Sequence, residues 1–508
     1  MRLDQAAGLF KDDGWYTVMA KAIATGQGLT LINFPVGGGV YFYPPIFPLL
    51  LSPVFAISDF PQNVWLLKSV SIIAIFLAGW LTYRLLMVRA ALPPTPAMLV
   101  AFCVVLGPSW VFLATSTVMS ECVYLAFQVA ALFAAERALS LDRISTGTIV
   151  FIAFLATLSY LTRSAGIVVI ITIALTLAKD RLYRAAFIFI LAFAFFVTPW
   201  TLYKRHLIAQ APAAIQNKLP KGYLTQTWQR AAGTDSQDFV TIRDLPLRFI
   251  QNTMVITTAD TGALLLPAVY RTAAESGEEV IDLTNVAWVP RDFIGWGKGT
   301  MGNAFGTKLL SLVISLTIIG GFLIACQARF GLLELFSLLF LATIVIWPGP
   351  TYRYLLPLSP LLFYYFALGV KGALSSLEAG ATDPWMFARA ALLCIISLFL
   401  YDHAGYISAR RQPLTEPSHP EWLRKYEASK AAAEWIRAHT AEKEVIAGDN
   451  LPMTYLYSGR KTDKCAPHAC AKLGLRYYLR QQDIYDFPAE DIRYQSPIYN
   501  QVRVAELK

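Results

Sequence analysis

The sequence has little charge for its length. Only 15% of its 508 residues are charged, whereas an average soluble domain carries about 25%. Hydrophobic residues make up 56% of the chain, and the mean hydropathy is +0.48. This composition argues against an ordinary soluble domain and predicts an integral membrane protein.

The chain also lacks the signatures of soluble nucleotide chemistry. It contains neither a Walker loop nor a Gly-x-Gly-x-x-Gly run between a strand and a helix. No repeat of fixed period is present, which argues against a solenoid. The formal net charge is +9, but an excess of Lys and Arg is expected in the cytoplasmic loops of membrane proteins. No basic run is interleaved with aromatic residues, so we expect no nucleic-acid partner.

Long apolar runs, by contrast, are abundant. A helix needs about 20 apolar residues, with a range of about 17 to 25, to cross a bilayer. Ten segments reach or approach this length: 64–87, 96–115, 119–138, 145–161, 164–179, 184–203, 308–327, 331–349, 353–373 and 385–402. The arginine-rich loops after the first, third, fifth and seventh segments are predicted to be cytoplasmic by the positive-inside rule. We therefore expect an all-α polytopic membrane protein of about ten transmembrane helices.

This topology divides the chain into three parts. Residues 1–60 are predicted to form an extracytoplasmic loop, in which "DDGWYTVMAKAIATG" indicates a short amphipathic helix at the membrane interface. Residues 61–402 form the transmembrane domain, with an extracytoplasmic loop at 204–307. In that loop, "IRDLPLRFIQNTM" indicates an interfacial helix with Arg243 and Arg248 near the lipid headgroups. Residues 403–508 are expected to form a small extracytoplasmic α/β domain, with strands at "EVIAG" and "RYYLRQ".

The six cysteines fall into two groups. Four lie in apolar stretches and are expected to behave as small buried side chains: Cys103, Cys122, Cys326 and Cys394. Cys465 and Cys470 instead flank the polar segment "CAPHAC". Outside the cytoplasm a disulfide is the expected state of such a pair. A metal site that includes His468 is the alternative, although only three ligands are visible.

Charged and polar residues gather at the predicted outer ends of five segments. They are Asp12, Asp13, Glu121, Arg163, Lys204, Arg205, Tyr352 and Arg353. Each has a structural explanation as well, because acids cap the N-termini of helices and basic side chains extend to lipid headgroups. Charged groups near the apolar phase are costly and mark functional cavities. Their convergence on one membrane face therefore favours a site.

A basic pocket at the membrane surface suits a lipid-linked phosphate. Arginine and lysine would hold the phosphate and stabilise it as a leaving group. A carboxylate opposite would remove the proton from an acceptor hydroxyl as a general base. The residue types thus predict transfer of a group from a lipid phosphate to an acceptor.

Five motifs in order carry a family resemblance. They are Asp12-Asp13 with Tyr16, "AIATGQG" and "YPPIFPLL"; Ser120-Glu121; Leu161-Thr162-Arg163 with Gly166; Pro199-Trp200 through Arg205; and Arg353 through Pro360. With these motifs, the sequence resembles the GT-C superfamily of membrane glycosyltransferases, which includes the protein O-mannosyltransferases and the lipid A aminoarabinose transferase. The resemblance extends over nearly the whole chain.

The resemblance implies roles for the candidate residues. Asp12 would be the catalytic base, Asp13 its neighbour or substitute, and Glu121 a second acid near the acceptor or a metal. The donor phosphate would be held by Arg163, Lys204, Arg205, Tyr352 and Arg353. The donor would be a polyprenyl-phosphate sugar, used with inversion on the periplasmic face of a bacterial inner membrane. Family members carry a span before the acidic loop, so we expect that the start of this chain has lost one. The alternative is that the following span carries the N-terminal segment across the membrane.

Other readings of the sequence remain open. A transporter or flippase for a lipid or sugar is the main alternative, although such proteins often show two similar halves with broken helices at the midplane, which we do not see. A non-catalytic assembly protein of the cell envelope is a third reading. The sequence does not specify the donor sugar, whether the acceptor is a lipid, a glycan or a protein, or whether a divalent metal is required.

Overall fold

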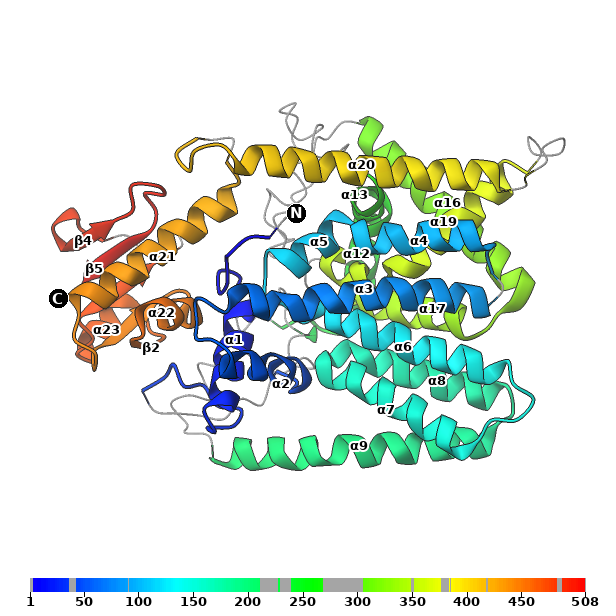
Figure 1. Ribbon diagram of the computed structural model, residues 1–508, viewed down its shortest axis with the longest axis horizontal. Coiled ribbons are helices and arrows are strands. Elements are labelled where there is room, and N and C mark those ends of the chain that lie inside the picture. The colour runs from blue at the N-terminus through cyan, green and yellow to red at the C-terminus, as the bar shows by residue number, and fades with distance from the viewer. Residues whose placement is uncertain are drawn as a thin grey trace.

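A computed structural model of the chain (Figure 1) shows a bundle of long helices with a small sheet domain at one end. The structure describes residues 3–35, 43–89, 91–210, 227–228, 239–267, 305–348, 351–375, 383, 385–416, 419–481 and 487–507. Much of the predicted loop at 204–307, including the segments 211–226, 229–238 and 268–304, lies outside the described residues.

All ten predicted transmembrane segments are helical. The bundle consists of α3 (Val64–Val88), α4 (Pro94–Leu106), α5 (Pro108–Thr115), α6 (Glu121–Leu139), α7 (Thr146–Thr162), α8 (Ile167–Lys179), α9 (Tyr183–Gln210), α16 (Phe305–Arg329), α17 (Leu332–Val345), α18 (Thr351–Leu355), α19 (Ser359–Ala373) and α20 (Met386–Arg410). Short 3₁₀ turns, η2 (Ser164–Gly166) and η5 (Leu356–Leu358), lead into α8 and α19. The predicted polytopic all-α class, with its C-terminal α/β domain, is confirmed.

The spans differ in length from the prediction. Among the described residues, six helices are long and apolar enough to cross a membrane, or seven if the bent pair α4–α5 counts as one span. Helices α7, α8 and α17 are shorter, with 17, 13 and 14 residues. The pair α4–α5 bends by 48° at Gly107, which has a ψ of 125°. Pro108 follows directly, and a residue before proline is driven out of the helical region.

Two glycines allow α16 and α19 to pack closely. A Cβ atom at Gly321 would lie 1.7 Å from the Tyr365 carbonyl oxygen, and one at Gly369 would lie 1.9 Å from the Thr317 carbonyl oxygen. Only a residue without a side chain fits at either position. Small residues give transmembrane helices this kind of backbone contact, in which dispersion rather than water exclusion holds the pair together.

An ionic junction, buried except for the half-exposed Arg329, joins four helices at the end of the bundle far from the sheet domain. The guanidinium group of Arg89 on α3 lies 3.1 Å from Glu136 of α6 and 2.8 Å from Glu334 of α17. Arg329 of α16 lies 3.1 Å from the same Glu136 oxygen. Two positive and two negative groups therefore balance. Charged side chains can be buried here because each one is paired with an opposite charge.

The N-terminal segment packs between the bundle and the C-terminal domain (Figure 1). Helix α1 (Asp12–Ala24) precedes α2 (Ile46–Leu51) and η1 (Ser52–Ala56). We expected α1 to lie in the membrane interface, but nine of its 13 residues are buried. The reason is that Val18 and Ala22 pack against Tyr455 and Leu456 of the C-terminal domain. Protein, not lipid, covers the apolar face of α1.

The C-terminal domain is a five-stranded sheet with three helices. The strands β1 (Val445–Gly448), β2 (Lys461–Asp463), β3 (Tyr477–Arg480), β4 (Ile492–Gln495) and β5 (Arg503–Glu506) follow the order β2-β1-β3-β5-β4. Strand β1 pairs in parallel with β2 and β3, whereas β5 is antiparallel to β3 and β4. The helices are α21 (Glu421–His439), α22 (Leu451–Ser458) and α23 (Pro467–Lys472), with a 3₁₀ turn η6 (Ala489–Asp491) before β4. Helix α20 continues to Arg410, past the predicted boundary at 402.

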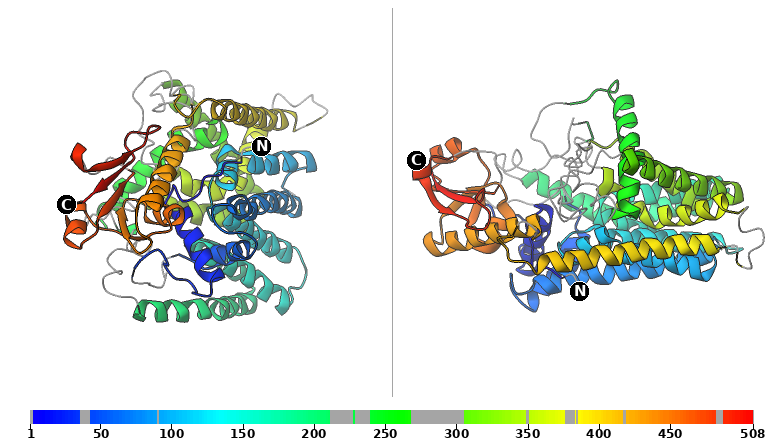
Figure 2. Two further views of the ribbon diagram at one scale, coloured as in Figure 1. Left: turned by 60° about the vertical axis from the view of Figure 1, so that its left-hand side comes forward. Right: turned by 90° about the horizontal axis from the view of Figure 1, so that it is seen from above.

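One helical segment does not run with the bundle. It comprises α12 (Leu245–Val255), a π-helical turn η3 (Ile256–Asp260) and α13 (Thr261–Leu265). In the right-hand view of Figure 2 this green segment stands across the helices of the bundle. It packs against α16 and α17, so it lies beside the chain that leads to Arg353.

Candidate active site

Four charged side chains from four separate elements meet at one end of the bundle, beside α1. Asp12 begins α1, Glu121 begins α6, Arg163 follows α7, and Arg353 lies in α18. Glu121 Oε1 lies 2.9 Å from an Nη atom of Arg163 and 2.6 Å from the Nε atom of Arg353. Arg353 in turn lies 3.4 Å from Asp12 Oδ2. The structure therefore joins Asp12 to Arg353, and Arg353 through Glu121 to Arg163.

Glu121 is enclosed by its two arginines. Its side chain is 1% exposed, and its Oε1 atom pairs with both guanidinium groups. Paired charges of this kind tolerate burial, and loss of one partner is costly. The geometry gives Glu121 the task of holding Arg163 and Arg353 together at one point.

Asp12 is the accessible acid of the group. Its side chain is 23% exposed, and the Tyr43 hydroxyl donates a hydrogen bond of 2.5 Å to Oδ1. The other oxygen, Oδ2, faces Arg353 at 3.4 Å, which is longer than an ordinary hydrogen bond. Asp12 is thus oriented by the tyrosine and the arginine and stays partly exposed.

Asp13 points the opposite way. Its carboxyl oxygens accept hydrogen bonds from three backbone N–H groups, those of Gly8 at 2.7 Å, Phe10 at 2.9 Å and Gly14 at 3.0 Å. The side chain is 1% exposed. Burial raises the pKa of Asp13 to about 7, although the three N–H donors oppose that shift. Asp13 therefore fixes the turn before α1. Although Asp12 and Asp13 are adjacent in the sequence, the first is partly exposed and the second is buried.

A tight turn places Arg163. The chain ends α7 at Thr162 and enters η2 at once, and a Cβ atom at Gly166 would lie 2.4 Å from the backbone nitrogen of Tyr160. Only glycine permits this fold-back. Arg163 Nη1 then donates a hydrogen bond of 3.2 Å to Ser120, whose hydroxyl donates one of 3.1 Å to the Tyr16 hydroxyl. This chain of contacts connects Arg163 to α1.

Three of the predicted residues lie apart from this cluster. The Tyr352 hydroxyl is 2.5 Å from Ser109 Oγ, and Tyr352 is buried. Lys204 is half-buried and Arg205 exposed on α9. In the described ranges neither residue forms an ion pair with an acid. The structure thus brings together Asp12, Glu121, Arg163 and Arg353 of the predicted set.

Sequence reasoning missed the hydroxyl groups of the cluster. Tyr43 lies in the proline-rich stretch "YFYPP", which offered no sign that this tyrosine would meet Asp12. Tyr16 and Ser120 were recognised as parts of motifs, but their contact with each other was not predicted. Such contacts join residues that are distant in the sequence, and local patterns do not encode them.

The cysteines and acids give no metal site in the described part of the chain. No group of three or more His, Cys, Asp or Glu side chains there could hold an ion. Cys465 and Cys470 are joined in a disulfide, so their sulfur atoms are not available as thiolate ligands.

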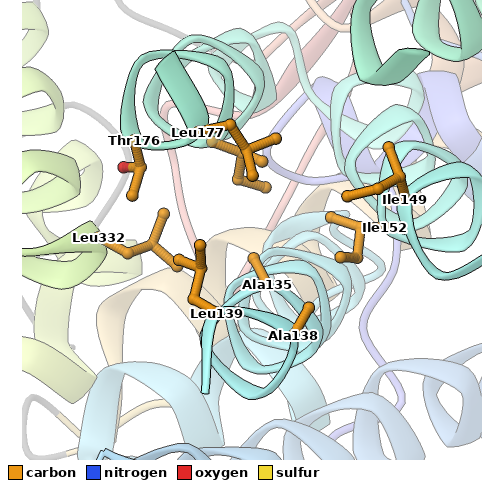
Figure 3. A pocket seen from close by; sticks show the side chains of 9 residues that line it. Ala135, Ala138, Leu139, Ile149, Ile152, Thr176, Leu177 and Leu332 are labelled. Carbon is orange, nitrogen blue, oxygen red and sulfur yellow. The ribbon is translucent and has the colours of Figure 1, made fainter. Parts of the chain in front are cut away.

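The pocket shown in Figure 3 lies away from the charged cluster. Ala135, Ala138 and Leu139 line it from the end of α6 opposite Glu121. Leu332 and Thr176 lie on the facing helices, and the Thr176 hydroxyl is bonded to the carbonyl oxygen of its own helix. Its walls therefore offer no free donor that could hold a phosphate.

The comparisons with known proteins bear on the fold. Neither a family model nor a curated protein matches the chain. Among solved structures, it is similar to the ArnT protein from Cupriavidus metallidurans bound to undecaprenyl phosphate, with a TM-score of 0.51 and 12% identity, over 100% of this chain and 95% of that one. The chain has the GT-C fold.

Two archaeal structures share this fold. The oligosaccharyltransferase of Archaeoglobus fulgidus, tethered to an acceptor peptide, gives a TM-score of 0.53 with 15% identity over 92% of this chain. AglB from the same organism, in complex with an inhibitory peptide and a dolichol-phosphate, gives 0.53 with 14% identity over 92%. The chain spans 64% and 65% of the lengths of the chains in these two structures. At such identities the GT-C likeness establishes the fold alone.

Proposed function

We propose that this protein is a membrane glycosyltransferase that moves a sugar from a polyprenyl-phosphate donor to an acceptor hydroxyl. The observation that carries the proposal is the contact between Asp12 and Arg353, which places an accessible carboxylate beside a guanidinium group held by Glu121. A base and a phosphate ligand are thus adjacent. Solved GT-C structures that hold undecaprenyl phosphate or a dolichol-phosphate support this choice of donor.

The proposed reaction assigns a role to each of these residues. Asp12 accepts the proton of the acceptor hydroxyl as its oxygen attacks the anomeric carbon. The bond from that carbon to the phosphate oxygen breaks, and its electron pair leaves with the polyprenyl phosphate. Arg353 and Arg163 stabilise the charge that develops on the leaving phosphate. A single displacement of this kind inverts the anomeric centre.

The proposed location is the extracytoplasmic face of a bacterial inner membrane. Arginines gather at the opposite end of the bundle, among them Arg89, Arg137 and Arg329, as the positive-inside rule expects of the cytoplasmic end. The cluster, α1 and the disulfide-bonded C-terminal domain then lie outside the cytoplasm, where disulfides persist.

The proposal is tested with purified protein in liposomes. Labelled polyprenyl-phosphate sugars are supplied with lipid, glycan and peptide acceptors, and nucleotide sugars serve as the comparison. We expect transfer from a polyprenyl-phosphate sugar only, and about tenfold weaker binding of undecaprenyl phosphate by Arg353→Lys, which keeps the charge but loses the planar fork. Movement of lipid across the bilayer without any transfer would favour a flippase and overturn the proposal.

A further inference from the structure

We propose that the crosswise segment 245–265, here called the brace helix, positions Arg353, and that Asn252 and Asp260 are its positioning residues. The inference rests on the proposed function, because it gives Arg353 a role toward the donor phosphate. The evidence begins at the break between α17 and α18. There the chain leaves one helix at Val345 and enters the next at Thr351, two residues before Arg353.

Asn252 of the brace helix holds the end of α17. The last carbonyl groups of a helix have no partner within it and need one elsewhere. Asn252 Nδ2 donates hydrogen bonds of 2.9 Å to the carbonyl oxygens of both Val345 and Trp347. Arg248, one turn earlier, donates to the Ile346 carbonyl oxygen at 3.3 Å. Three successive carbonyl groups of the break are thus satisfied from one face of the brace helix.

Asp260 holds the start of α18. The Thr351 hydroxyl donates a hydrogen bond to Asp260 Oδ2. Asp260 is 0% exposed and Thr351 is 4% exposed, so neither can exchange this partner for water. A buried polar group left without a partner costs about 1–3 kcal/mol. The bond therefore fixes the first residue of the short helix that carries Arg353.

The π-helical turn brings the two contacts onto one face. In a regular α-helix, residues eight apart do not lie exactly in line, because eight residues exceed two turns. The turn Ile256–Asp260 is π-helical and so holds an extra residue. This extra residue rotates Asp260 back toward the line of Asn252. Single π-helical turns occur often at functional sites.

The brace helix is itself anchored. Ser315 of α16 donates a hydrogen bond of 2.8 Å to the Thr257 carbonyl oxygen, and its hydroxyl lies 2.6 Å from that of Thr261. The outer side of the helix carries exposed apolar side chains that suit a lipid interface: Leu247, Phe249, Ile250 and Met254. One side of the brace helix is thus fixed to the bundle, and the opposite side is exposed.

These contacts decide where the guanidinium group of Arg353 lies. Its Nε atom must stay at 2.6 Å from Glu121 while its Nη atoms reach toward Asp12. Helix α18 has only five residues, so a shift at Thr351 passes directly to Arg353. A displacement of about 1 Å at a reacting group can cost a hundredfold in rate. The brace helix prevents that displacement.

Conservative and disruptive substitutions separate a positioning role from a merely structural one. Asp260→Asn and Thr351→Ser keep the hydrogen bond, whereas Asp260→Ala and Thr351→Val remove it, and Asn252→Ala frees the carbonyl groups of the break. We expect the three disruptive variants to bind undecaprenyl phosphate in nanodiscs about tenfold more weakly. The two conservative variants should bind within about twofold of wild type. Thr258→Ala is the control, because that hydroxyl bonds only to its own helix.

A measurement without ligand makes the test independent of the proposed function. Hydrogen exchange of the peptide 345–355 should be faster in the disruptive variants and unchanged in Thr258→Ala. Unchanged exchange in Asn252→Ala and Asp260→Ala would overturn the brace, as would unchanged lipid-phosphate binding in variants whose exchange is faster. If wild type bound no undecaprenyl phosphate at all, the proposed function would fail, and the exchange data would still decide whether the brace holds this segment.

Discussion

Asp12 and Arg353 meet across 341 residues of sequence, with Asp12 Oδ2 3.4 Å from both Nη atoms of the arginine. The same guanidinium group holds Glu121 more closely, at 2.6 Å through Nε. Asp12 is therefore the more distant of the two acids that face this guanidinium group, and the Tyr43 hydroxyl holds its other oxygen.

Replacing Asp12 with asparagine removes the proposed base and keeps its shape. We expect sugar transfer to fall at least 100-fold, which is the lower end of what a general base contributes, about 10²–10⁴. Binding of undecaprenyl phosphate should change less than threefold, because Arg353 and Glu121 remain. Asp59→Asn, at an exposed position before α3, is the control and should transfer normally. Normal transfer by the Asp12 variant would remove Asp12 from the mechanism.

Removing the charge of Glu121 should destabilise the protein. Glu121→Gln removes the acid that pairs with Arg163 and with the buried Arg353, and breaking a buried pair costs about 3–5 kcal/mol. Thermal unfolding in detergent measures the loss. Asp180→Asn removes a pair with Lys179 at 3.7 Å whose side chains are 37% and 45% exposed, and it should cost less than about 1 kcal/mol. An equal loss of stability in the two variants would contradict the role of Glu121 as the acid that holds both arginines.

Asp13 should make stability depend on pH. Its pKa is about 7 in the folded protein against an ordinary value of 3.8, so the folded state binds the proton more tightly. Its contribution to the free energy of unfolding is complete below about pH 4. As the pH rises from there through about 7, that free energy falls by at most about 1.4 kcal/mol per pH unit. Asp13→Asn cannot ionise. The stability of wild type relative to this variant should therefore fall between pH 4 and 7, as followed by unfolding at several pH values; a difference that rises over this range would be the wrong sign.

Gly14 should not tolerate a methyl group. A Cβ atom there would lie 2.8 Å from Pro452 Cβ and 2.9 Å from its Cγ, so α22 would have to move away from α1. We expect Gly14→Ala to cost about 1–3 kcal/mol, as overpacking does. Gly147→Ala, where the nearest atom is 3.8 Å away, should be neutral or stabilising by up to about 1 kcal/mol. Limited proteolysis of the C-terminal domain checks whether α22 is released; Pro452→Gly, which removes both clashing atoms, should relieve the clash.

The sequence predicts the bundle well because apolar length alone determines it. Each of the ten segments becomes a helix, since an apolar run inside a bilayer must satisfy its own backbone hydrogen bonds. The strands β1 and β3 were also predicted from local patterns. Strands β4 and β5 were not, because their pairing depends on partners elsewhere in the chain.

The candidate site was predicted in composition but not in detail. Charge at the outer ends indicated Asp12, Glu121, Arg163 and Arg353, yet nothing local distinguishes Asp12 from Asp13. The difference comes from what surrounds each carboxyl group after folding. Arg248 shows the same limit: we expected it near headgroups, but it is 8% exposed and donates to backbone carbonyl groups. A long basic side chain looks identical in sequence whether it meets lipid or protein.

Helix α6 carries a buried glutamate at each end. Glu121 binds the arginines of the candidate site, and Glu136 binds Arg89 and Arg329 at the far end, about 22 Å away at 1.5 Å per residue. Sliding α6 along its axis would pull apart both sets of ion pairs at once. Helix α6 therefore holds the two sets of ion pairs, one at each end of the bundle, at a constant distance from each other. Any motion that admits or releases a substrate must then take place around α6 and leave its position unchanged.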